Sequence, residues 1–240
     1  MLRRSVIQLL ASGVLFALLG GRSRALPQPA AYSFAHGVAS GDPLKDAVIL
    51  WTRVSGASGE PLTVRWQVAR DAAMQNVVAA GVAATNAERD YTVKVDVGNL
   101  PSGARLHYRF EVGDSVSPVG ATRTLPAGSM DAARFAVVSC SNYPYGYFYA
   151  YREIARRDDI EAVIHLGDYI YEYGMGEYAT ERAEDLDRVP DPPTELHTLS
   201  DYRRRYAQYR SDPDLQAMHA AHPVIAVWDD HEIANDGWRD

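Results

Sequence analysis

The feature that most constrains the fold of this chain is a change in the spacing of its apolar residues near Arg134. Before Arg134, short runs place an apolar residue at every second position. This spacing is typical of half-buried antiparallel strands. After Arg134 the apolar runs are continuous, which is typical of strands covered on both faces. The sequence therefore predicts two different folds in succession.

The first half predicts a β-sandwich. Runs with alternating apolar residues lie at 47–54, 62–70, 91–100 and 105–114. Clusters of Gly, Pro and Ser separate them, as expected of turns between strands. We therefore expect a sandwich of the fibronectin or immunoglobulin type over residues 32–126, followed by a linker. His36, in a Gly-rich segment at its start, is expected to be structural.

The second half predicts an α/β fold over residues 134–240. Two continuous apolar runs, 134–140 and 160–168, flank a stretch at 147–159 with helical periodicity. A strand, a helix and a strand within about thirty-five residues form a βαβ unit, so the two strands should be parallel. A third buried strand is expected at 224–230.

The segment between the second and third of these strands predicts a loop and two helices. Residues 174–198 are acidic and contain prolines, which favours a long surface loop with solvated charges. One helix is expected from about Ser200. A second is expected from Asp212 as N-cap, with Pro213 in the first helical position.

Chemically reactive side chains follow each of the three continuous runs. They are Cys140 after the first, Asp168 and Tyr171 after the second, and Asp230, His231 and Asn235 after the third. Parallel strands bring their carboxyl ends to one edge of a sheet, where ligands of open α/β folds bind. We therefore expect these groups to converge.

This mixture of groups favours a metal site over covalent catalysis. Nearby acids oppose formation of a Cys140 thiolate, even with His231 as its base, unless a cation lies among them. Thiolate and phenolate ligands favour an iron-type ion, and carboxylate and amide oxygens suit calcium, magnesium or manganese. Asp168 is placed to bridge two ions.

Each of these residues also has a purely structural interpretation. Cys140 is the single cysteine, so it forms no intramolecular disulfide; it is a buried inert thiol, an intermolecular link, or a ligand or nucleophile. Asp168 alone would be a turn residue, and Tyr171 alone a packing residue. The acidic pair before His231 would be a helix cap with a solvated neighbour.

The blocks "SCSNYPYG", "HLGDYIYEYG" and "WDDHEIANDGW" resemble the first half of the phosphoesterase domain of PhoD-like alkaline phosphatases, a branch of the metallophosphoesterase superfamily. The segment "FAHGVASGDP…ILWTRV" is similar to the start of the fibronectin-like N-terminal domain of that family. The resemblance runs from about Tyr32 to Asp240.

The resemblance implies a role for each site residue. Cys140, Asp168 and Tyr171 would be metal ligands, with Asp168 bridging, and His231 a catalytic group near the phosphate. Within the last block the ligand is Asp230 or Asn235, of which we favour Asn235. The cofactors implied are Fe3+ and Ca2+.

The activity implied is hydrolysis of small phosphate monoesters by a metal-activated hydroxide, as in phosphate scavenging. A phosphodiesterase or phospholipase-D-like activity of the same family is an alternative, and so is a noncatalytic secreted binding module. The later V-x-x-H and G-H-x-H motifs of the family have no counterpart, and no two histidines form an H-x-H. We therefore expect residues 134–240 to be an incomplete catalytic domain, nearly inactive alone.

The N-terminus predicts export. Arg3 and Arg4 precede an apolar stretch, and Ser23-Arg24-Ala25 is a small-x-small cleavage site, so residues 1–25 resemble a signal peptide. The stretch is too short for a stable membrane span. The arginine pair also resembles a twin-arginine signal, which makes the Tat export machinery an expected partner and the periplasm or the exterior the expected location. Cleavage changes the formal charge from −7 to −11, which disfavours nucleic acid as a specific partner.

Overall fold

The computed structural model describes residues 32–57 and 59–237, so the predicted signal peptide at 1–25 lies outside the described residues. Among the described helices, none combines the length and apolar character that crossing a bilayer requires. The elements in chain order are β1 (Val38–Gly41), β2 (Val48–Arg53), β3 (Leu62–Ala69), β4 (Val77–Thr85), η1 (Ala87–Arg89), β5 (Thr92–Val97), β6 (Arg105–Val112), β7 (Ser115–Val116), β8 (Gly120–Arg123), β9 (Phe135–Val138), η2 (Tyr143–Tyr145), α1 (Tyr149–Ala155), β10 (Ala162–His165), α2 (Leu199–Arg210), α3 (Pro213–Ala221), β11 (Pro223–Ala226) and η3 (Asp230–Glu232).

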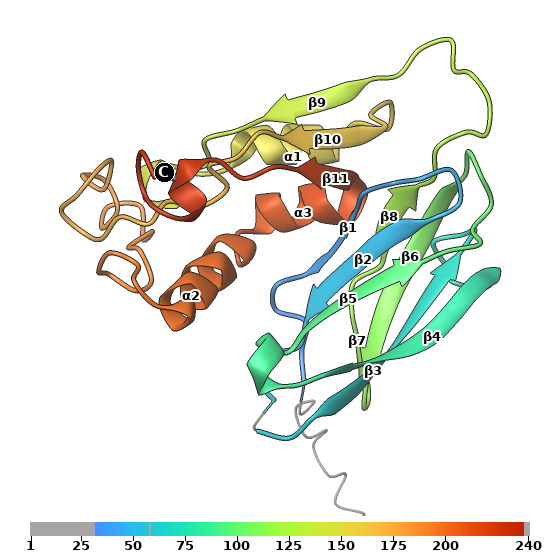
Figure 1. The fold of residues 1–240 in the computed structure, drawn as a ribbon, viewed down its shortest axis with the longest axis horizontal. Coiled ribbons are helices and arrows are strands. Elements are labelled where there is room, and N and C mark those ends of the chain that lie inside the picture. The colour runs from blue at the N-terminus through green and yellow to red at the C-terminus, as the bar shows by residue number, and fades with distance from the viewer. Residues whose placement is uncertain (1–31, 58, 238–240) are drawn as a thin grey trace, which may run out of the picture.

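Two β-sheets account for most of the first half (Figure 1). One sheet has the order β4-β3-β6-β7, with β8 also paired to β6, and its strands are antiparallel. The strands β5, β2 and β1 begin the other sheet. Both sheets supply side chains to one apolar core, for example Leu50 from β2 and Phe110 from β6, each 0% exposed. The alternating runs of the sequence therefore form packed antiparallel strands, as expected.

The second sheet continues into the α/β half of the chain. Its order is β5-β2-β1-β11-β10-β9, so β1 and β11 are neighbours. They pair in parallel, with Ser40 opposite Pro223 and Gly41 opposite Val224. A Cβ on Gly41 would lie 2.7 Å from the carbonyl oxygen of Val224, so only glycine permits this approach. The sequence predicted no strand at 38–41 and therefore did not predict this pairing.

The three strands after Arg134 are parallel, as predicted. Val163 of β10 is opposite Ala136 of β9 and Val224 of β11. Side chains of α1 and α3, among them Tyr151 and Met218, pack with these strands in a second apolar cluster (Figure 1).

The prediction that all three strands are covered on both faces was wrong for the described residues. On β9, Phe135 is 48% and Val137 is 61% exposed, and Ile225 of β11 is 38% exposed. Only alternate residues of β9, Ala136 and Val138, pack against the cluster with α1 and α3, and both are partly buried.

The two predicted helices form where their caps indicate. The Thr198 side chain accepts a hydrogen bond from the Asp201 N–H and the Asp201 carboxylate accepts one from Thr198, a capping box at the start of α2. Asp212 caps α3, with Pro213 in the first turn.

The expected loop at 174–198 contains no helix or strand, but its charges are not all solvated. Arg188 is only 5% exposed and forms an ion pair with Asp212, with nitrogen and oxygen 2.7 Å apart. Its guanidinium also stacks 3.5 Å from the centre of the Tyr143 ring. This buried contact joins the loop to the beginning of α3.

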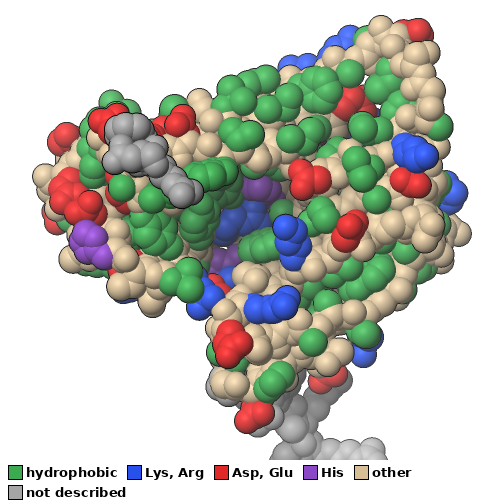
Figure 2. All heavy atoms as spheres, viewed as in Figure 1, with side chains coloured by type: hydrophobic (Ala, Val, Ile, Leu, Met, Phe, Trp, Pro, Cys, Tyr) green, Lys and Arg blue, Asp and Glu red, His purple; other side chains and the backbone are tan. Residues whose placement is uncertain are grey.

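A groove of about 910 Å³ lies between α2 and the β2–β5 edge of the sheet. Arg and His side chains lie at its base and apolar side chains on its walls (Figure 2). Trp51, Tyr206 and Trp228 line it together with Arg210 and His219. The lining of this groove includes three residues that follow the parallel strands: Tyr169, Trp228 and Glu232.

Burial of His165 makes the stability of the fold depend on pH. The side chain is 0% exposed, and burial lowers its pKa to about 4. An unfolded histidine has a pKa of about 6.5, so the contribution of neutral His165 is complete above that pH and is lost as the pH falls through about 4. We expect this residue to account for roughly 3 kcal/mol of the decrease in the free energy of unfolding.

Urea unfolding measured between neutral pH and pH 4 tests this expectation. His165→Gln should make the decrease in stability with falling pH shallower. His197→Gln, at a side chain that is 72% exposed, should leave the slope unchanged. Equal slopes for His165→Gln and the unmodified chain would contradict the assignment.

Candidate metal centre

Asp168 is the central residue of the site. It follows β10 and is 8% exposed. Its Oδ2 atom lies 3.5 Å from Sγ of Cys140, which follows β9, and accepts a hydrogen bond from the Tyr171 hydroxyl at 3.1 Å. Three of the predicted site residues, from the ends of two strands, therefore meet at one carboxylate oxygen.

The backbone turns sharply at two of these residues. Cys140 has φ 60° and Asp168 has φ 52°, values that few residues other than glycine adopt. The Cys140 N–H donates to the carbonyl oxygen of Gly167 at 3.2 Å, and the Ser141 N–H donates to that of Asp168 at 2.9 Å. These bonds join the two strand ends and hold both left-handed turns, which are more frequent at functional sites than elsewhere.

Gly167 lets the loop after β10 contact the loop after β11. Its φ is 102°, and a Cβ built on it would lie 2.5 Å from Cβ of Asp229. Any larger residue would push the two loops apart. This contact is necessary for the residues after β11 to approach Asp168.

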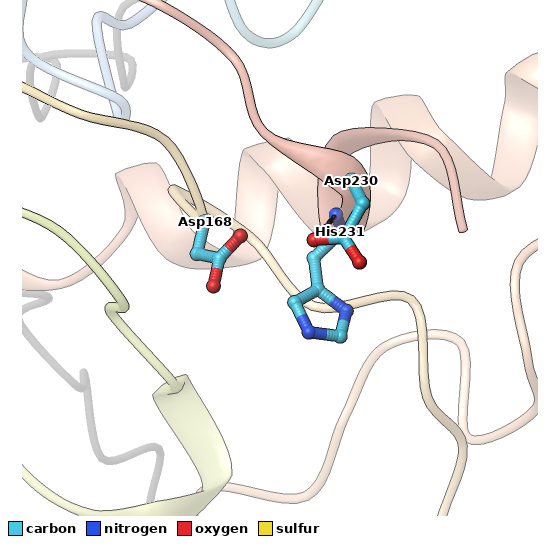
Figure 3. A group of neighbouring side chains, drawn as sticks. All are labelled: Asp168, Asp230 and His231. Atoms are coloured by element: carbon cyan, nitrogen blue, oxygen red, sulfur yellow. Dashed lines mark hydrogen bonds between the residues drawn. The ribbon is translucent and has the colours of Figure 1, made fainter. Parts of the chain in front are cut away.

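Asp230 and His231 complete the cluster from the short helix η3 (Figure 3). Asp168, Asp230 and His231 each have one ligand atom within 4.8 Å of those of the other two. The Asp230 carboxylate accepts backbone hydrogen bonds from Asp236 and His231, which lower its pKa. Asp229 has the capping role considered in the sequence analysis, because its side chain accepts from the Asp230 N–H.

Glu232 binds the two loops together. Its carboxylate accepts backbone N–H groups from Asp168 at 3.1 Å, from Asp229 at 2.7 Å and from Tyr169. Hydrogen bonds from N–H groups to an ionised carboxylate are stronger than those between neutral groups. One side chain therefore sets the distance between the Asp168 turn and η3.

Glu172 makes a second connection between the same loops. It is 2% exposed, and Oε2 lies 2.9 Å from Nδ1 of His231. Its Oε1 accepts the backbone N–H of Asn235 at 2.6 Å. Glu172 and Glu232 lie inside the quoted sequence motifs, but neither was predicted to have a role. The signal available in the sequence was their position: Glu172 is four residues after Asp168, and Glu232 directly follows His231.

Asn235 is near the cluster, but its side chain is exposed and donates to Asp236 at 3.0 Å. Cys140 is also exposed, so the interpretation of its thiol as buried and inert was wrong. Of the predicted site residues, Cys140 and Tyr171 lie within hydrogen-bonding distance of the Asp168 carboxylate, and Asp230 and His231 each have a ligand atom within 4.8 Å of it.

The electrostatics of this cluster suit a cation. Burial, Asp168 and Cys140 raise the pKa of Tyr171 well above its ordinary value, so the phenol keeps its proton when no positive charge is near. The other carboxylate oxygen of Asp168, Oδ1, is buried and has no hydrogen-bond partner among the described residues. A thiol, a phenol, two carboxylates and an imidazole are a donor set that metal ions bind. These residues fit a metal ion.

Parallel strands that end in such a donor set define a metal-binding α/β protein. The model of the family "PhoD-like phosphatase" matches residues 135–240, and that of "PhoD-like phosphatase, N-terminal domain" matches residues 21–126. The chain belongs to the PhoD-like phosphatase family.

One curated relative and one solved structure agree with this assignment. The chain is 41% identical to alkaline phosphatase D of Bacillus subtilis strain 168 over 221 residues, which cover 88% of this chain and 37% of that protein. It is 40% identical to a solved structure described as PhoD, with a TM-score of 0.78, over 88% of this chain and 41% of the other. The chain thus spans less than half the length of both.

Removing the Glu232 carboxylate should destabilise the fold. Glu232→Ala leaves three backbone N–H groups without their acceptor, and we expect a loss of about 2–4 kcal/mol in the free energy of unfolding. Urea denaturation measures this loss. The control is Glu153→Ala, at an exposed ion pair with Arg156, with an expected change within about 0.5 kcal/mol. Similar values for both variants would show that Glu232 does not join the loops.

Proposed function

We propose that the protein is a metal-dependent phosphoric ester hydrolase that acts on small phosphate monoesters. The convergence of Cys140, Tyr171, Asp230 and His231 on Asp168 carries this proposal, because it gathers metal-binding groups at the carboxyl edge of a parallel sheet. The name of the relative, alkaline phosphatase D, supports the choice of reaction.

We also propose a division of the chain into two domains. Residues 32–126 would form the fibronectin-like β-sandwich and residues 134–240 a part of the metallophosphoesterase domain. The ranges matched by the two family models, 21–126 and 135–240, support this division. The pairing of β1 with β11 means that one sheet crosses the boundary.

The metals proposed are Fe3+ and Ca2+. Cys140 and Tyr171 would hold iron, because thiolate and phenolate ligands favour it over alkaline-earth ions. Asp230 or Asn235 would hold calcium through oxygen, with Asp168 shared between the two ions. Such ions supply positive charge to a phosphate and lower the pKa of bound water.

The residues of the chain itself would position the substrate. His231 turns Nδ1 towards Glu172, which leaves Nε2 free at the cluster. Once protonated on both nitrogens, the imidazolium would donate from Nε2 to a phosphate or leaving-group oxygen. Without cations, the carboxylates of Asp168 and Asp230 would repel a phosphate. Substrate binding should therefore depend on metal.

Export of the protein is part of the proposal. The arginine pair, the apolar stretch and the small-x-small site within residues 1–25 support a signal peptide, with Tat transport and a periplasmic or external location. Phosphate scavenging would suit such a location.

The Asp168 carboxylate should be essential for metal binding. Loss of a hydrogen-bond partner of a metal ligand costs about 10–100-fold in affinity, and loss of a charged ligand itself should cost at least as much. Asp168→Asn should therefore weaken binding of Fe3+ and of Ca2+ at least about tenfold. Isothermal titration of the 240-residue chain with each metal measures the affinity. Asp114→Asn, at an exposed position in the β-rich half, is the matched control. Equal affinities for both variants would show that Asp168 is not a ligand.

Turnover of an aryl phosphate in the presence of Fe3+ and Ca2+ tests the reaction itself. The sequence has no H-x-H and spans 37% of alkaline phosphatase D, so we expect turnover to be slow for the 240-residue chain and much faster for a protein with the length of that relative. Asp168→Asn should abolish it in both. A higher rate with an aryl phosphodiester would favour the diesterase alternative, and metal-independent rates would contradict the proposal.

A further inference from the structure

We propose that Glu172 is a positioning residue that holds the imidazole of His231 in one tautomer, with the proton on Nδ1 and with Nε2 facing the metal cluster. The catalytic meaning of this arrangement rests on the proposed function. The arrangement itself is a property of the fold, and its test needs neither metal nor substrate.

The two carboxylate oxygens of Glu172 contact different partners. Oε1 accepts the backbone N–H of Asn235 at 2.6 Å, and Oε2 lies 2.9 Å from Nδ1 of His231. The side chain of Glu172 is 2% exposed and that of His231 is 11% exposed, so water competes little for either group. Among the described residues, His231 is the ion-pair partner of Glu172.

A carboxylate in this position selects the tautomer. Buried carboxylates need hydrogen-bond donors, and an ionised carboxylate only accepts. Nδ1 of His231 must therefore carry a proton to satisfy Oε2. Carboxylates that orient histidines at metal sites act in the same way, by fixing which ring nitrogen is free.

The backbone that carries Glu172 is itself held in place by Arg205 of α2. This arginine is 1% exposed, and its guanidinium donates to the carbonyl oxygens of Tyr171, of Tyr173 at 3.0 Å and of Pro192 at 2.8 Å. The residues on both sides of Glu172 are thus tied to a buried side chain of α2. The carboxylate is presented from a rigid segment.

The ring of Tyr171 restricts His231 from a second direction. The centres of the two rings are 4.3 Å apart. Two consecutive residues therefore contact the His231 imidazole: the Tyr171 ring lies against its face, and the Glu172 carboxylate lies at its Nδ1 edge. This explains how a histidine in a short helix, η3, keeps one orientation.

Substitution of Glu172 by glutamine gives a sharp test, because it should reverse the tautomer. The Asn235 N–H can only donate, so the amide oxygen of the glutamine must face it. The amide NH2 group then faces Nδ1 of His231, which has to become the acceptor, and the proton moves to Nε2. Glu172→Ala removes both contacts and should leave a mixture of tautomers.

Nitrogen NMR of the metal-free 240-residue chain, labelled with 15N in its histidine rings, measures the tautomer at mildly alkaline pH. In the unmodified chain we expect the Nδ1–H form of His231 to exceed the Nε2–H form at least about tenfold, because the acceptor is charged. In Glu172→Gln the ratio should invert. Glu195→Gln removes the charge from an exposed Glu–His pair, 3.8 Å apart, and should leave His231 unchanged.

Circular dichroism establishes that each variant is folded. A proton on Nε2 of His231 in the unmodified chain, or an unchanged tautomer in folded Glu172→Gln, would overturn the proposal. Failure of the proposed function is seen separately, as absence of metal binding in the titrations with Fe3+ and Ca2+ while the tautomer still responds to Glu172.

Discussion

The pairing of β11 with a strand on each of its sides is the interaction on which the rest of the structure depends. On one side Val224 is in register with Val163 of β10, and on the other with Gly41 of β1. The first pairing aligns the strand ends that carry the cluster. The second joins these strands to the β-rich half, so both halves share one sheet. Because Gly41 approaches the Val224 carbonyl so closely, this connection depends on a residue without a side chain.

Strand alignment alone brings the loops to one edge of the sheet, and buried acids then set the distances between them. Glu232 accepts backbone N–H groups from the Asp168 turn. Glu172 accepts the backbone N–H of Asn235 and lies 2.9 Å from Nδ1 of His231. Each carboxylate therefore reaches from one loop to the other. The result is a cluster rich in acceptors, in which the pKa of Tyr171 is raised and Oδ1 of Asp168 has no hydrogen-bond partner among the described residues.

Much of the fold could be predicted from local signals. The cap at Asp212 predicted the start of α3, and a helix was expected from about Ser200, where α2 lies. Continuous apolar runs predicted the parallel strands. The strand β4 was missed because its sequence, "VVAAGVAAT", has small residues and weak alternation. The strand forms by antiparallel pairing with β3 along its length, from Leu62 opposite Thr85 to Ala69 opposite Val77. The exposure of Val137 was not predictable either, since an apolar run does not say which neighbours cover it.

The sequence by itself determined the types of groups at the site and the strands from which they come, because hydrophobic periodicity and strand direction are local properties. It also offered Asp230 and Asn235 as alternative ligands and favoured Asn235. Only the tertiary structure decided that Asp168 contacts Cys140 and Tyr171, and that Glu172 and Glu232 hold the loops. Those contacts join residues up to 64 positions apart, and their distances follow from sheet register and loop packing, which no short stretch of sequence encodes.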